Sequence, residues 1–506
     1  MLFNSYAFLL GFLPLALLGF AWLSGRYERA TILFLVLASL AFYSWSSPWQ
    51  HVALLVLSIA FNFAVGLALL WTKTAILRSM LLALGVTADL ALLGYFKYSG
   101  FLLAEVAQFD FAQGLLLPLG ISFYTFTQLA YLIDTYRGEA RGRDFATYAL
   151  FVTWFPHLIA GPILHHREMI PQFATVFRER VQWRLVLIGL AIVSVGLAKK
   201  VLLADQVAPF ADAVFDRARL LPLTFAEAWT GALAYAMQIY FDFSGYIDMA
   251  IGLSLMFGVR IPLNFNSPYK AASIIDFWRR WNMTLSRFLR DYLYIPLGGN
   301  RRGVVRRGIN LMVTMLLGGL WHGAGWTFVI WGGLHGVYLI VNHTWRATGI
   351  NLPRAVCVAL TFGATVVAWV FFRASDFSSA LAMLRPMIFG HGLALPSSLA
   401  SLLGPLDVIG LRFDGAFANA LFPNVTPALA TIGVMVAMVW FLPNTYEIFQ
   451  QVRPAIAPAG DDRFVKEPAI AIKWQPGWRW GIAVGLLLGV SFTKLGGESP
   501  FLYFRF

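Results

Sequence analysis

Long apolar runs recur along nearly the whole of this 506-residue chain, and they constrain its fold more than any other feature. A helix needs roughly 17–25 mostly apolar residues to cross the hydrocarbon core of a bilayer. The chain is 59% hydrophobic and 12% charged, so its polar groups are too few to cover its apolar surface in water. We expect a polytopic all-α membrane protein, with about a dozen transmembrane and re-entrant helices in a single domain over residues 1–506. Suitable runs lie near 6–23, 30–46, 51–71, 76–96, 114–134, 182–203, 223–241, 309–343, 353–372, 424–442 and 479–497, with weaker segments at 145–163, 245–262 and 399–421.

The positive charges predict how these helices are oriented. A net charge of +13 would suggest a nucleic-acid partner in a soluble protein, but here it indicates basic cytoplasmic loops and anionic lipid headgroups. The first three basic clusters occupy alternate loops, which places those loops in the cytoplasm and the N-terminus outside. The first apolar run has no basic leader or cleavage site, so it is expected to remain as a membrane span. The clusters are Arg26 with Arg29, Lys73 with Arg78, and Arg137 with Arg141 and Arg143.

The weaker segment 145–163 breaks the alternation of loops. Basic residues flank it on both sides, and Pro156, Gly161 and Pro162 interrupt it. These features predict a re-entrant hairpin. Non-helical backbone at that depth is tolerated only where protein or a water-filled cavity surrounds it. The sequence therefore predicts a cavity beside this segment.

The most charged part of the chain is residues 270–308, which contain nine basic and two acidic residues. This composition predicts a cytoplasmic location. On a helical wheel over 276–292 the apolar residues share one face and the arginines lie opposite, which is typical of an amphipathic interfacial helix. The apolar face consists of Trp278, Trp281, Leu285, Phe288, Leu289 and Tyr292.

His322 is a titratable residue in the middle of the apolar, glycine-rich run 309–343, where an unpaired polar group costs several kcal/mol. An intramembrane ionisable residue indicates a functional site. If 309–343 is one continuous helix, His335 lies about 20 Å along it and about 220° around it, too far to share a proton or a metal with His322. The neighbouring glycines would leave space beside the His322 ring. Alternatively, they serve close helix packing and His322 only bonds a backbone carbonyl.

The remaining histidines are expected to be less informative. His157 lies in the proposed hairpin, where a structural hydrogen bond is more common than a role in a cavity. The others sit in loops or at segment ends and are expected to be solvated or interfacial: His51, His165, His166, His343 and His391. No cysteine cluster and no His–Glu pair at helical spacing suggests a metal site.

Two further sets of polar residues need an interpretation. Asn282 lies at the border of the apolar and basic faces of the predicted interfacial helix, where asparagine is usually just tolerated. Four carboxylates in apolar segments could form an ion path, which is the transporter alternative, or could bond neighbouring groups and fix the bundle. A transporter should show two similarly interrupted halves, and the sequence has no such repeat. These carboxylates are Asp89, Asp134, Asp242 and Asp248.

Taken together, several segments resemble the membrane-bound O-acyltransferases, and within them the bacterial alginate O-acetyltransferase branch. The most specific piece is DFWRRWNMTLSRFLRDYLYIPLGGNRRG at 276–303, followed by WHGAGW at 321–326. The order of the pieces matches over nearly the whole chain. The others are GISFYTFTQLAYLIDTYRG (120–138), FPHLIAGPI (155–163), GLAKKVLLAD (196–205), YFDFSGYIDMAIGLSLMFG (240–258), WVFFRA (369–374) and FLYFRF (501–506).

The resemblance implies a helical bundle around a funnel or tunnel, with His322 and Asn282 as catalytic residues. Bacterial relatives usually carry histidine at the position where this chain has Asn282. Because asparagine replaces that histidine, the resemblance implies a positioning role at 282 rather than proton transfer. His322 would act as general base, a task that suits the pKa of histidine. The donor implied is cytosolic acetyl-coenzyme A, a substrate rather than a bound cofactor. Its phosphates would contact Arg279, Arg280 and Arg287.

The resemblance also implies a place for the reaction in the cell. The acetyl group would cross the bacterial inner membrane to a periplasmic or membrane-anchored acetyltransferase partner. That partner would modify an exported polysaccharide, of which alginate is the first expectation. Cellulose, peptidoglycan or another envelope polymer are the alternatives within the same chemistry.

Overall fold

The computed structural model describes residues 1–103, 116–388, 417, 419, 421–422, 425–457, 470, 472–495 and 501–502. Within these ranges the chain is helical, apart from one isolated β-bridge between Pro262 and Ile456. The expected all-α class is therefore confirmed. His391 and almost all of the weak segment 399–421 lie outside the described residues.

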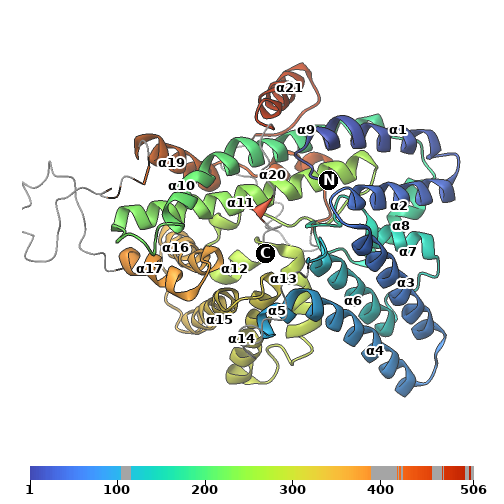
Figure 1. The fold of residues 1–506 in the computed structure, drawn as a ribbon, viewed down its shortest axis with the longest axis horizontal. Coiled ribbons are helices and arrows are strands. Elements are labelled where there is room, and N and C mark those ends of the chain that lie inside the picture. Colours follow the sequence, from blue (N-terminus) through green and yellow to red (C-terminus); the bar gives the residue numbers. More distant parts are fainter. Residues whose placement is uncertain are drawn as a thin grey trace, which may run out of the picture.

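The helices form an N-terminal group, a central layer, a third group and a set of C-terminal elements (Figure 1). The N-terminal group contains η1 (Ala7–Phe12), α1 (Leu13–Leu23), α2 (Glu28–Ser44), α3 (Trp49–Trp71), α4 (Ala75–Leu93), η2 (Gly94–Tyr98), α5 (Ser99–Phe101), α6 (Ile121–Arg137), α7 (Phe145–Thr153) and α8 (His166–Val176). The central layer contains α9 (Trp183–Ala198), η4 (Lys199–Ala204), α10 (Asp205–Phe215) and α11 (Phe225–Met256). The third group contains η5 (Pro268–Lys270), α12 (Ile274–Trp278), α13 (Met283–Leu289), η6 (Arg290–Tyr294), α14 (Gly303–His322), α15 (Trp326–Ala347), α16 (Arg354–Arg373) and α17 (Phe377–Ile388). The C-terminal elements are α19 (Val425–Phe441), α20 (Thr445–Ile448), η9 (Gln450–Val452) and α21 (Trp478–Phe492).

Several of these helices are apolar enough to lie in a bilayer. Four continuous helical stretches in the described ranges have the length and composition to cross a membrane: Trp49–Trp71, Ala75–Phe101, Trp183–Phe215 and Arg354–Arg373. Shorter apolar helices cover Ala7–Leu23, Phe377–Ile388, Val425–Phe441 and Trp478–Phe492. The apolar runs thus predicted where helices form.

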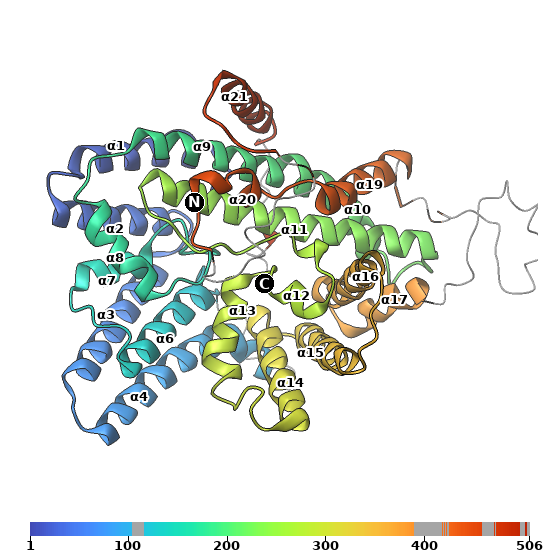
Figure 2. The ribbon, with the colours of Figure 1, turned by 180° about the vertical axis from the view of Figure 1, so that it is seen from behind.

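The central helix α11 corrects one of these predictions. We expected two separate segments at 223–241 and 245–262, but α11 continues unbroken from Phe225 to Met256. A capping box between Thr224 and Glu227 starts it. The helix runs beside α9 in both views (Figure 1, Figure 2). Glycines permit this approach: a Cβ on Gly189 would lie 2.4 Å from the carbonyl oxygen of Gly252.

Ion pairs fix the central layer where polar groups enter it. Lys199 contacts Asp248 at 2.6 Å and Lys200 contacts Asp242 at 2.8 Å, so both lysines of η4 hold α11. The backbone N–H of Leu502 also donates to Asp242, at 3.0 Å. The interpretation that these carboxylates fix the bundle is confirmed for Asp242 and Asp248. Paired in this way, they offer little support for an ion path.

The run 309–343 is a helical hairpin rather than the single helix we expected. α14 ends at His322, residues 323–325 are extended or bent, and α15 begins at Trp326 and returns beside α14. The two backbones almost touch, because a Cβ on Gly319 would lie 2.3 Å from the carbonyl oxygen of Phe328. A Cβ on Gly332 would lie 2.2 Å from the carbonyl oxygen of Met315. The glycines therefore serve close helix packing, as one of the two interpretations held.

Replacing Gly319 with alanine is expected to force α14 and α15 apart and to lower the free energy of unfolding by about 1–3 kcal/mol. The thermal unfolding midpoint of the detergent-purified protein measures the effect. Gly333→Ala is the matched control, because its Cβ would first meet the Cδ2 atom of Leu316 at an ordinary 3.4 Å. Equal midpoints for the two variants would contradict the close approach of the backbones.

Candidate functional site

His322 lies at the C-terminal end of α14, 4% exposed, inside an aromatic cage. The cage consists of Trp321, Trp331 from α15 and Phe372 from α16. Their ring centroids lie 4.9, 5.0 and 5.3 Å from that of His322, all edge to face. The expectation that glycines leave open space beside the ring is wrong, since aromatic side chains enclose it. Such walls keep bulk water from the ring and strengthen electrostatic interactions there.

His335 also belongs to this cage. The hairpin brings it back beside His322, and its ring lies 4.9 Å from the same Trp331. Phe277 and Trp278 cover its other sides, at 6.0 and 5.1 Å. The separation of about 20 Å expected for a continuous helix is therefore wrong. The sequence did not show the turn at 323–325 that joins the two histidines.

Lys97, from the N-terminal group, holds the end of α14 in place. Its Nζ donates to the carbonyl oxygens of Trp321 at 2.6 Å and His322 at 3.1 Å, and to the hydroxyl of Ser122 at 3.2 Å. The hydroxyl of Tyr98 donates to the carbonyl of Leu320 at 3.0 Å. The last carbonyls of a helix have no partner within it and carry a partial negative charge, so a cation is favourable there. Sequence reasoning missed Lys97, although a lone lysine beside an apolar run was a usable signal.

The basic segment departs from the predicted single amphipathic helix. α12 ends at Trp278, Asn282 adopts a left-handed conformation with φ 41° and ψ 56°, and α13 then begins at Met283. Asparagine tolerates this conformation better than most residues. The predicted apolar face is nevertheless largely buried, with Trp281 and Leu285 at 2% and 1% exposure. The helical wheel thus predicted correctly which side chains are buried, but it predicted one continuous helix where the structure has two.

Asn282 is a buried residue at this break, 2% exposed, not a residue at the edge of an exposed helix. Its Nδ2 has no hydrogen-bond partner among the described residues. Leaving a buried donor unpaired costs about 1–3 kcal/mol. The preceding Trp281 packs on Trp369 at 4.9 Å, and Trp369 stacks on Trp331 at 5.7 Å. Asn282 therefore lies at the far end of a row of indoles that reaches the His322 cage.

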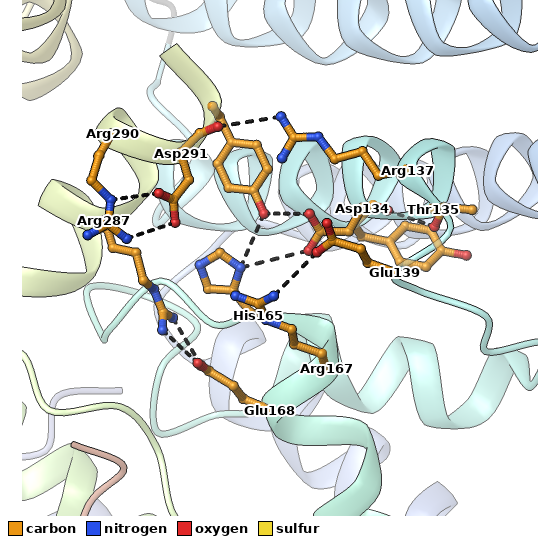
Figure 3. A network of polar contacts seen from close by, with 12 residues as sticks. Asp134, Thr135, Arg137, Glu139, His165, Arg167, Glu168, Arg287, Arg290 and Asp291 are labelled. Atoms are coloured by element: carbon orange, nitrogen blue, oxygen red, sulfur yellow. Dashed lines mark hydrogen bonds and ion pairs between the residues drawn. The ribbon is translucent and has the colours of Figure 1, made fainter. Parts of the chain in front are cut away.

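The three arginines proposed as donor contacts differ in their surroundings. Arg287 forms a bidentate ion pair with Glu168: Nη1 donates to Oε1 at 2.6 Å and Nη2 donates to Oε2 at 3.0 Å (Figure 3). Arg280 pairs with Asp276 at 3.0 Å and donates to the carbonyl of Asn266 at 3.2 Å. Arg279 is exposed and forms no ion pair within the described part of the chain. Arg279 is therefore the one of the three whose charge is left for a ligand.

A second polar network ties the end of η6 to α6. The hydroxyl of Tyr292 donates to Asp134 at 2.7 Å and lies 3.2 Å from Nδ1 of His165; Asp134 and His165 themselves lie 3.8 Å apart (Figure 3). His165 is 1% exposed and His166 is 7% exposed, so of the two positions expected for them, solvated or interfacial, the solvated one is wrong. Burial lowers the pKa of His166 to about 4, which leaves its ring neutral at pH 7.

The segment 145–163 is interrupted, as predicted. α7 ends at Thr153, and residues 154–164 continue without regular helix while every one of them is buried. His157 Nε2 lies 3.1 Å from the carbonyl oxygen of Phe151, which confirms the structural hydrogen bond expected for it. The backbone N–H of Ile163 donates to the hydroxyl of Thr284 at 3.0 Å. Protein thus surrounds this backbone, and the segment anchors the start of α13.

The site is formed by two buried histidines, His322 and His335, by the aromatic rings around them and by Asn282. Among the described residues, no group of three or more His, Cys, Asp or Glu side chains is arranged to hold a metal ion. Residues 69–371 match the model of the membrane-bound O-acyltransferase family. The chain belongs to this family.

Relatives that match the full length of this chain indicate which acyl group such an enzyme transfers. It is 44% identical to the peptidoglycan O-acetyltransferase of Helicobacter pylori, over 100% of this chain and 98% of that protein. It is 39% identical to the probable alginate O-acetylase of Pseudomonas aeruginosa, over 100% of both chains. The teichoic acid D-alanyltransferase of Streptococcus thermophilus is 25% identical over 51% of this chain and 69% of its own. The protein is thus a membrane O-acyltransferase whose full-length relatives transfer acetyl groups.

Replacing Lys97 with methionine is expected to lower acetyl transfer by about 10- to 100-fold, because the end of α14 loses its cation and His322 shifts from its position. Lys97→Arg keeps the charge and should retain most of the activity. Steady-state rates of the purified variants measure this. Wild-type turnover by Lys97→Met would show that the lysine does not position His322.

Proposed function

We propose that the protein takes acetyl groups from cytosolic acetyl-coenzyme A and passes them through the inner membrane for O-acetylation of an exported polysaccharide. The observation that carries this proposal is the place of His322. It is a buried imidazole at the C-terminal end of α14, caged by aromatic rings, inside the region that matches the acyltransferase family. Packing alone gives no reason for a histidine there.

His322 would act as general base. An acceptor hydroxyl gives its proton to the imidazole as its oxygen attacks the thioester carbon. The carbon–sulfur bond then breaks, and the coenzyme A thiolate takes up the proton. The aromatic cage would protect the thioester from hydrolysis by excluding water. Asn282 would orient the donor or the imidazole through its unpaired amide.

The donor would enter beside the basic segment. Coenzyme A is polyanionic, and residues 270–307 carry nine basic side chains. Because Arg280 and Arg287 are already paired with carboxylates, exposed Arg279 is the first candidate contact for a phosphate. The positive-inside rule puts this segment on the cytoplasmic side, where the donor is.

The acceptor would be a hydroxyl outside the membrane, on a periplasmic or membrane-anchored partner that modifies the polymer. Alginate is the first candidate, because a relative that spans the whole chain carries that polymer in its name. Peptidoglycan is the second candidate, favoured by the 44% identity to a peptidoglycan O-acetyltransferase. Both polymers carry free hydroxyl groups, so the chemistry at His322 is the same for either.

The decisive variant is His322→Ala, which should abolish cleavage of radiolabelled acetyl-coenzyme A by the purified protein when the acceptor partner is supplied, a loss of at least about 10²-fold for a general base. In cells, the same variant should lose ester-linked acetate from the natural acceptor. Measuring acetate on both alginate and peptidoglycan identifies that polymer. Thioester cleavage at the wild-type rate by the variant would refute the catalytic assignment.

Arg279→Gln is expected to raise the KM for acetyl-coenzyme A several-fold without changing the melting temperature, because this side chain is exposed. Arg287→Gln should instead lower stability by about 1–3 kcal/mol, since Glu168 loses its paired partner. Donor titrations and thermal unfolding of both variants separate the roles. An unchanged KM in Arg279→Gln would remove this residue from the donor site.

A further inference from the structure

His335 is held in one tautomer by its neighbour. The indole N–H of Trp278 donates to Nδ1 of His335 at 3.3 Å. Because an indole nitrogen can only donate, Nδ1 must be the acceptor, and the ring proton of the neutral imidazole is on Nε2. The ring is fully buried, and Nε2 has no partner among the described residues. His335 therefore presents a fixed, unused N–H donor.

Trp331 carries a second donor, on a ring that contacts both histidines. Its indole nitrogen is buried and has no acceptor in the part of the chain that the structure describes. Its ring touches both histidines, at 5.0 Å from His322 and 4.9 Å from His335. Phenylalanine at 331 would keep an aromatic ring in the cage and leave no polar atom unpaired. An unpaired tryptophan at this position suggests a ligand that supplies the acceptor.

Both unused atoms are donors, which defines the chemistry of their ligand. Two N–H groups beside a general base complement an oxygen with lone pairs and growing negative charge. The carbonyl oxygen of a thioester is such an atom, and it becomes an oxyanion when a nucleophile adds to the carbon. His335 cannot readily accept a proton at Nδ1, because the Trp278 N–H occupies that lone pair. It therefore suits hydrogen-bond donation better than proton transfer.

We propose that Nε2–H of His335 and Nε1–H of Trp331 form the binding site for the acyl carbonyl oxygen and the oxyanion that develops from it. The inference rests on the proposed acyl transfer at His322 and adds its electrophile-binding site. The acceptor oxygen forms a bond to the carbonyl carbon while its proton moves to His322. The π pair moves to the carbonyl oxygen, held by the two donors. When the C=O bond re-forms, the C–S bond breaks and the thiolate takes the proton from His322.

The test compares turnover and affinity in the purified full-length protein, with acetyl-coenzyme A as donor and the acceptor partner supplied in excess. Trp331→Phe and His335→Phe should each lower kcat by about 10²–10³-fold, the effect of losing one oxyanion donor. The KM for the donor should stay within a few-fold, since the hydrogen bonds strengthen mainly in the transition state. His335→Gln returns an amide N–H near the position of Nε2 and should recover at least about tenfold over His335→Phe.

Two controls separate catalysis from folding. Trp440 on α19 also has an unpaired indole nitrogen, but it packs on Phe362 and has no ring contact with His322. Trp440→Phe should leave kcat unchanged. Trp331→Phe removes buried volume, so we expect a lower melting temperature but a folded protein at the assay temperature. If Trp331 had only a structural role, kcat measured on the folded variant would stay within a few-fold of the wild-type value.

The outcomes distinguish this inference from the function on which it rests. If Trp331→Phe and His335→Phe keep more than half of the wild-type kcat while His322→Ala is inactive, the oxyanion site is refuted and the acyl-transfer function stands. A rise in KM at constant kcat would likewise refute it, because the donors would then bind substrate and transition state equally. Full activity of His322→Ala would refute the proposed function itself.

Discussion

Hydrocarbon offers no hydrogen-bond partner, and the arrangement of polar groups in this protein follows from that constraint. Several charged side chains that enter the apolar interior pair with a group from another segment. Lys199 and Lys200 face Asp248 and Asp242, and Lys97 faces the last carbonyls of α14. These contacts join segments far apart in the sequence, so the polar groups that lipid cannot solvate also determine which helices become neighbours.

The sequence predicted the helices of the bundle well, because apolar length alone decides whether a segment can span hydrocarbon. The runs 51–71, 353–372 and 424–442 correspond to α3, α16 and α19 within a few residues. Predictions failed where tertiary contacts determine the backbone. Asn282 interrupts the basic helix, the turn at 323–325 divides a run that reads as continuous, and α11 joins two segments that read as separate. Helical periodicity shows none of these breaks.

The candidate site was predicted in the same uneven way. His322 was identifiable because a titratable side chain in an apolar run has few structural explanations. His335 was set aside on the assumption of a straight helix, and the hairpin places it on the same indole as His322. The solvated state expected for His165 was wrong because a basic loop can fold back under its own arginines. A single sequence shows the chemistry of each residue more readily than it shows which residues lie beside it in space. The cage around His322 depends on those spatial neighbours.

The Lys97 cap has a consequence for how the protein is made. The ammonium group and the His322 carbonyl are separated by 225 positions along the chain. A ribosome therefore inserts the N-terminal helices long before the acceptors of Lys97 exist. Until α14 arrives, that charge has to remain near the membrane surface, where water can reach it. The candidate site is thus completed only when the hairpin of α14 and α15 docks, and a nascent chain shorter than 322 residues lacks both His322 and the carbonyl group that pairs with Lys97.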